Sequence, residues 1–164
     1  MCNYFSCLID KNGKTYWKIG INSHGDLEKY FKITDNEDRS EFLEFAKIEV
    51  DPKTKKVIVD EPIPSWFNEG YNQFCLDSFN ECEKTMKDYV FEKNYKGNLD
   101  LNGCTLPENL KLPETVGCNL DLSGCTLPEN LKLPETVEGS LYLQGCTFPA
   151  NLKLPEKLKN KIIR

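Results

Sequence analysis

The sequence predicts an α+β N-terminal unit followed by a short β-solenoid, or leucine-rich-repeat-like stack, of about three 21-residue coils. Near-identical copies of the phrase LPENLKLPE in the C-terminal part carry this prediction, and Cys104, Cys125 and Cys146 recur every 21 residues. A fixed period of roughly 20 to 29 residues is typical of leucine-rich repeats and β-helical coils. Such coils bury their apolar edges only by stacking on one another.

The residues ahead of the repeats show no periodicity, so the chain divides into segments of different character. Residues 1–93 are expected to form an α+β domain that ends in a long capping helix, and residues 94–158 the repeats. Residues 159–164 remain as a C-terminal tail. A chain of 164 residues has room for two small domains.

The N-terminal elements follow from turn and capping signals. Residues 4–9 and 15–21 alternate like strands, and the Asn12-Gly13 pair between them is a strong hairpin signal. Ser23 can cap a helix that follows it.

Two further strands are expected at residues 45–50 and 57–59. An amphipathic helix is expected at about residues 68–91. A solenoid leaves its first coil exposed unless another element covers it, so this helix is the predicted N-terminal cap.

Within each repeat, alternating leucines predict two short strands. Leu99 and Leu101 form one inward pair, Leu110 and Leu112 the second, and both pairs recur in the later copies. The three repeat cysteines are expected to form a buried column of reduced thiols, because free cysteine packs as a small hydrophobe.

Composition limits the functional class. The net charge is −5 and the isoelectric point about 5.1, which argues against general nucleic-acid binding. No segment has the 18 apolar residues of a membrane span, and the start lacks a signal peptide, so a cytoplasmic protein is expected. The eight cysteines include no CxxC pair and the chain has one histidine, so no metal site is expected.

Partner contacts are expected at outward positions of the repeats and at the two tryptophans. These residues are Asp100, Asp121, Tyr142, Lys111, Lys132, Lys153, Trp17 and Trp66. Solvated strand faces need polar residues in any case, and copying a repeat creates such rows automatically. Core or inter-domain packing is the favoured explanation of the tryptophans, because a unit of this size needs large residues to fill its centre.

Enzymatic activity is not expected, and no cofactor is implied. A catalytic reading would need His24, a cysteine such as Cys7, or paired carboxylates, and no local signature supports any of them. Phosphate-loop, dinucleotide and zinc-protease motifs are absent from the sequence.

Several short motifs together resemble those of small phage and prophage accessory proteins. The motifs are Asn3-Tyr4-Phe5-Ser6-Cys7, Asn12-Gly13, Trp17, Ser23-His24, Lys47-Ile48-Glu49-Val50 and Pro64-Ser65-Trp66-Phe67. In that group a short α+β unit precedes repeats with LxLxGC and LPxxL phrases, and no catalytic residue is implied. The LPENLKLPE phrase is also similar to bacterial leucine-rich repeats, except that Gly-Cys follows the first strand where those repeats have Asn.

The resemblance implies a non-catalytic inhibitor that binds a host protein or complex, such as a CRISPR or other anti-phage defence complex. The alternatives are a sponge for a small nucleotide signal and a structural interaction module. The partner and the oligomeric state stay open.

Overall fold

The computed structural model describes residues 5–34 and 42–163. The chain is a small mixed α/β protein whose backbone contacts define two compact units, divided between Cys82 and Glu83. The division falls inside a helix, ahead of the position near residue 93 expected from the sequence. Cys2 and the start of the predicted first strand lie outside the described residues.

The N-terminal unit is built on one antiparallel sheet. Its strands are β1 (Phe5–Asp10), β2 (Thr15–Tyr16), β3 (Phe45–Val50) and β4 (Val57–Val59), in the order β2-β1-β3-β4. The predicted hairpin is confirmed, because Leu8 pairs with Tyr16 across it. Gly13 in its turn has a φ of 81°, a backbone conformation that favours glycine.

Helix α1 (His24–Phe31) lies against β1 and begins as the sequence predicts. The side chain of Ser23 accepts a hydrogen bond from the backbone N–H of Asp26 at 3.4 Å, which caps the first turn. Leu27 is fully buried and anchors the helix.

Helix α2 (Asn72–Met86) packs on the opposite face of this sheet. Its Cys75 and Phe79 form one buried cluster with Cys7 and Ile48 of the strands. These strand residues alternate with Leu8, which is also fully buried, so the sheet is covered on both faces.

Helix α2 ends earlier than the predicted residue 91. The N–H groups of Lys87, Asp88 and Tyr89 bond to carbonyls three residues back, which tightens the chain into turns. Val90 then forms a parallel bridge with Lys111. The segment after the helix therefore supplies the first backbone partner of the repeats.

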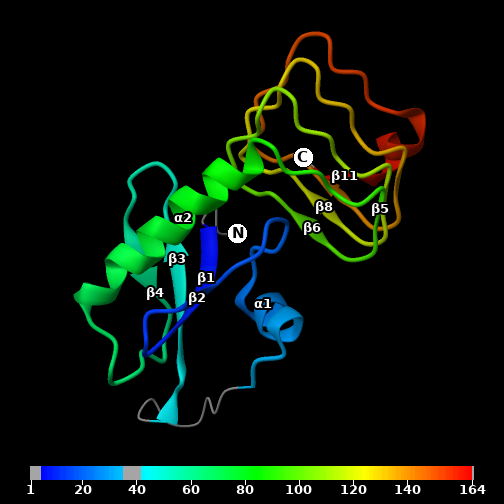
Figure 1. Ribbon diagram of the computed structural model, residues 1–164. Helices are drawn as coiled ribbons and strands as arrows, with labels where there is room; N and C mark the ends of the chain where they lie inside the picture. Colours follow the sequence, from blue (N-terminus) through cyan, green and yellow to red (C-terminus); the bar gives the residue numbers. More distant parts are fainter. Residues whose placement is uncertain (1–4, 35–41, 164) are drawn as a thin grey trace. The chain divides into compact units, whose positions relative to one another are not determined.

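The C-terminal unit contains two parallel sheets made of two-residue strands. The strands are β5 (Asn94–Tyr95), β6 (Leu99–Asp100), β7 (Thr115–Val116), β8 (Leu120–Asp121), β9 (Thr136–Val137), β10 (Leu141–Tyr142) and β11 (Ile162–Ile163). Their orders are β11-β10-β8-β6 and β5-β7-β9, and every pair is parallel. Successive repeats follow similar paths in Figure 1, from green to red.

Backbone pairing joins equivalent positions of neighbouring repeats. Leu99 pairs with Leu120 and Leu120 with Leu141. Asn98 and Asn119 support this register, since each side-chain oxygen accepts a hydrogen bond from a backbone N–H 21 residues later. The repeats are thus in register at their own period.

Leucines fill the interior of the repeats. Leu101, Leu122 and Leu143 are at most 2% exposed, as the sequence predicts. The predicted second strand through Leu110 and Leu112 is wrong, because the ladder forms at Thr115–Val116 instead.

Local turns explain the shift of the second strand. The N–H of Leu110 bonds to the carbonyl of Pro107 and Leu131 repeats this with Pro128, so both N–H groups are withdrawn from any ladder. Proline lacks an N–H and interrupts pairing further.

The repeat cysteines do not form a uniformly buried column. Cys125 is 1% exposed, whereas Cys104 and Cys146 are half-buried. The thiol of Cys125 donates to the carbonyl of Leu101 at 3.1 Å and that of Cys146 to Leu122 at 3.0 Å. These thiols therefore tie one repeat to the next.

None of the helices within the described residues combines the length and apolar character that crossing a bilayer requires.

Candidate functional site

The first predicted contact row runs across β6, β8 and β10. Asp100 pairs with Asp121, and Asp121 with Tyr142, so the three residues lie side by side. All three are half-buried, and the row continues to Ile163 of β11, which is 38% exposed.

The two aspartates have a local structural task. One carboxylate oxygen of Asp100 accepts the backbone N–H of Asn102 at 3.0 Å, and Asp121 accepts that of Ser123 at 2.8 Å. Each aspartate therefore fixes the turn after its strand. Tyr142 has no carboxylate and cannot fix a turn in this way, so this local structural role does not account for a tyrosine in the row.

The second predicted row borders a groove of about 590 Å³ between neighbouring repeats. Leu110, Leu112 and Leu133 provide its apolar lining, and Lys111 and Lys132 both contribute to its wall. Lys153 does not line this groove, and it is exposed in the last repeat.

The groove lies along a part of the repeats where neighbouring segments are not paired as strands. Thr115 pairs with Thr136 beside it, but in the part of the chain that the structure describes no backbone bridge joins Lys111 to Lys132. The two LPENLKLPE segments are joined at their ends, where the N–H of Glu135 bonds to the carbonyl of Glu114 at 2.9 Å, and the groove lies along the part that no bridge joins.

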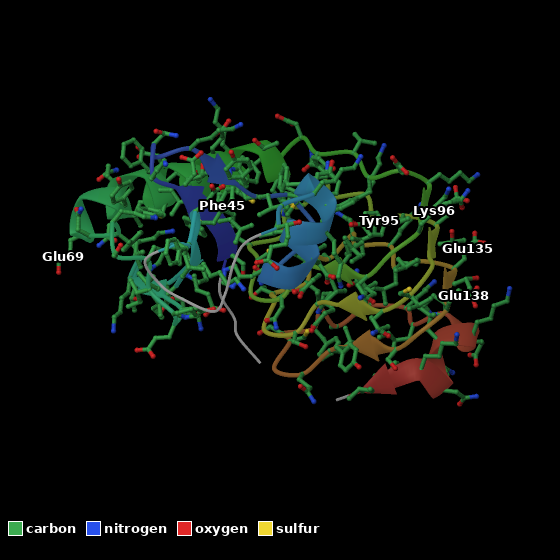
Figure 2. All side chains as sticks on the ribbon, turned by 90° about the horizontal axis from the view of Figure 1, so that it is seen from below. Phe45, Glu69, Tyr95, Lys96, Glu135 and Glu138 are labelled. Carbon is green, nitrogen blue, oxygen red and sulfur yellow. The ribbon has the colours of Figure 1, made fainter. Side chains whose placement is uncertain are left out.

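The charge of the groove is mixed but predominantly acidic. Glu108, Glu114 and Glu135 line it together with the two lysines. Figure 2 shows Glu135 and Glu138 projecting outward from the same side of the repeat unit. Glu114 forms an exposed ion pair with Lys93 at 3.0 Å, and an exposed pair of this kind contributes little to stability.

Both predicted tryptophans pack within the N-terminal unit. Trp17 meets the ring of Phe5 edge-on, with centroids 6.0 Å apart. The indole N–H of Trp66 donates to the carbonyl of Leu43 at 2.8 Å. Both are half-buried against the core cluster, and these contacts account for them as packing residues.

Cys7 and His24 have separate surroundings. Cys7 is fully buried under α2, where a hydrogen bond with Cys75 and burial raise the pKa of its thiol well above the usual value. A thiol held in its protonated form is a poor nucleophile. His24 instead lies beside Asp60, with its Nδ1 3.2 Å from the carboxylate.

His24, Glu49 and Asp60 form a cluster that the sequence does not predict. Their potential ligand atoms all lie within 4.8 Å of one another, and each residue is half-buried. The three come from α1, from β3 and from the residue after β4, so no sequence spacing marks them. Only the pairing of β3 with β4 brings the two carboxylates together.

Comparison with known proteins gives no match, since no protein-family model fits the chain and no curated protein or solved structure resembles it significantly.

Proposed function

We propose that this chain is a non-catalytic binding protein that holds an extended segment of a partner protein in the groove of its repeats. The observation that carries this proposal is the groove itself, which combines leucines with charges of both signs. Binding sites commonly join an apolar surface to a few placed polar groups.

The proposed architecture is a short β-solenoid or leucine-rich-repeat-like stack of about three coils. The parallel pairs at equivalent repeat positions support it. A stack held by backbone hydrogen bonds loses little freedom when a partner binds, and this lowers the entropic cost of association.

The charges favour a protein over a nucleotide. The groove has three carboxylates beside its two ammonium groups and Lys93 pairs with only one of them, so a phosphate bound by the lysines would also face Glu108 and Glu135 and gain little net attraction. A peptide segment with at least one basic side chain can pair with Glu108, Glu114 or Glu135, while its acidic or carbonyl groups meet the lysines.

The resemblance to phage accessory proteins gives this proposal a biological direction. The partner would then be a bacterial host factor, and a defence complex such as a CRISPR effector is the first candidate to test. A nucleotide sponge is the competing function.

Affinity capture from a bacterial lysate separates these functions. The immobilised intact chain should retain a protein identified by mass spectrometry. The double charge reversal Lys111→Glu with Lys132→Glu should reduce its recovery at least about tenfold, because acidic groups of the partner would then be repelled.

Lys157→Glu is the matched control, since Lys157 is an exposed lysine of the same unit that does not line the groove. Equal recovery with the double variant and the wild type would contradict the proposed surface. Release of a nucleotide by heat, seen as ultraviolet absorbance, with no retained protein would favour the sponge.

A further inference from the structure

A polar cluster lies on the α1 face of the N-terminal sheet, in the unit that the groove does not involve. Glu49 of β3 alternates with Ile48, which belongs to the core under α2, so Glu49 points to the opposite face. The backbone N–H of Asp60 bonds to the carbonyl of Lys47 at 2.9 Å, which places Asp60 opposite Lys47 on the same face.

The imidazole of His24 is held in a definite orientation. Its Nε2 lies 2.9 Å from the carbonyl of Ile48, and a carbonyl can only accept, so Nε2 carries a proton. In neutral histidine this leaves the lone pair on Nδ1, 3.2 Å from the Asp60 carboxylate, and since a carboxylate also only accepts, the two groups need a proton or a metal ion between them. A second ring nitrogen bonded to a backbone carbonyl is the usual support of a metal-binding histidine.

The distance between His24 and Asp60 fits a shared ion. Two ligand atoms at about 2.0 to 2.1 Å from a tetrahedral zinc lie about 3.3 Å apart. The separation of His24 Nδ1 from the Asp60 carboxylate is 3.2 Å, and the Glu49 carboxylate is within 4.8 Å of both.

The charge of the cluster also calls for a cation. Among the described residues the side chain of Glu49 has no hydrogen bond or ion pair, and Lys47 on the same face pairs with Glu28 at 3.1 Å. With a neutral imidazole the cluster carries two negative charges, which one divalent ion neutralises. The side chain of His24 is only 11% exposed, so little solvent screens these charges on its side.

We propose that His24, Glu49 and Asp60 bind one divalent transition-metal ion, with zinc as the first choice and manganese as the second. Imidazole and carboxylate together suit both ions. The ion ties the start of α1 to the ends of β3 and β4 and keeps at least one coordination position for water. The side chain of Asp60 is 40% exposed, so the ion can enter from solvent.

The chain has a single histidine, which makes its imidazole signals unambiguous in nuclear magnetic resonance. Zinc added to the metal-free intact chain should shift the Nδ1 resonance of His24 and leave Nε2 protonated. Manganese should broaden the same signals selectively. An imidazole that stays unchanged with either ion, or that is protonated on both nitrogens throughout, would overturn the proposal in favour of a simple ion pair with Asp60.

Manganese titration by calorimetry then tests the carboxylates, because manganese avoids the thiols to which zinc also binds. Glu49→Gln and Asp60→Asn should each weaken binding at least about tenfold. Glu81→Gln removes an exposed carboxylate of the same unit and should change the affinity less than about twofold. Equal affinities for all folded variants would refute the assignment.

Discussion

Leu122→Ala tests the packing of the repeats at their centre. Leu122 is fully buried between its equivalents Leu101 and Leu143, which are at most 2% exposed. The substitution removes three carbon atoms from a site that is apolar on both sides.

The expected cost follows from transfer and cavity terms. Removing the carbons costs about 2.4 kcal/mol at about 0.8 kcal/mol each. The neighbouring backbones cannot close the gap, because Leu122 N–H bonds to the Tyr142 carbonyl at 3.0 Å and Leu101 N–H to Asp121 at 2.9 Å. The total loss of unfolding free energy should therefore reach about 3 to 5 kcal/mol.

Urea denaturation followed by far-ultraviolet circular dichroism measures this loss. Tryptophan fluorescence in the same samples reports the N-terminal unit alone, because Trp17 and Trp66 both belong to it. Leu154→Ala makes the same chemical change at a half-buried position of the last repeat and should cost about 1 to 2 kcal/mol. A loss below about 1 kcal/mol for Leu122→Ala, or equal losses for the two variants, would refute the packing argument.

Three further predictions concern single repeat residues. Burial raises the pKa of Cys125 to about 12 from an ordinary 9.0. The unfolding free energy should therefore be insensitive to this thiol below pH 9 and fall by about 1.4 kcal/mol per pH unit between pH 9 and about pH 12. In urea titrations, the unfolding free energy of Cys125→Ala should decrease less with pH in this range than that of the wild type. An equal decrease in both would contradict the raised pKa of Cys125. Ser123→Ala should stabilise the chain by about 1 kcal/mol, because its buried hydroxyl has no hydrogen-bond partner among the described residues, and a destabilised variant in the same assay would show a partner such as water. Asp121→Ala should lower the unfolding free energy by about 1 kcal/mol, because the backbone N–H of Ser123 loses the carboxylate that fixes the turn, and an unchanged unfolding free energy in the same assay would contradict this role.

Local signals in the sequence predict most of the N-terminal unit. The Asn12-Gly13 turn and the Ser23 cap act over a few residues, so neighbouring residues alone determine them. The alternation in residues 45–50 likewise reflects a strand whose two faces have different surroundings.

The repeats show where a pattern is insufficient. Alternating leucines suggested a strand through Leu110 and Leu112, but the turn bond from Leu110 to Pro107 consumes the N–H that a ladder needs. The β-branched pair Thr115-Val116 forms the ladder instead. Hydrophobic alternation predicts which side chains are buried, but it does not predict which backbone N–H and carbonyl groups form the hydrogen bonds of a ladder.

The candidate sites depend still more on tertiary structure. The rows of Asp100 and Lys111 follow from the period, but the loss of pairing that opens the groove does not. His24, Glu49 and Asp60 belong to three different elements, so only the folded sheet brings their ligand atoms together.

Site-specific photo-crosslinking tests the proposed binding surface most directly. The intact chain carrying benzoylphenylalanine in place of Lys132 should form a covalent adduct with the protein that the wild type captures, and excess wild-type chain should suppress it. The same probe in place of Lys157, or of the exposed Lys14 in the N-terminal unit, should form no such adduct. Adducts at Lys14 or Lys157 with none at Lys132 would contradict binding in the groove of the repeats.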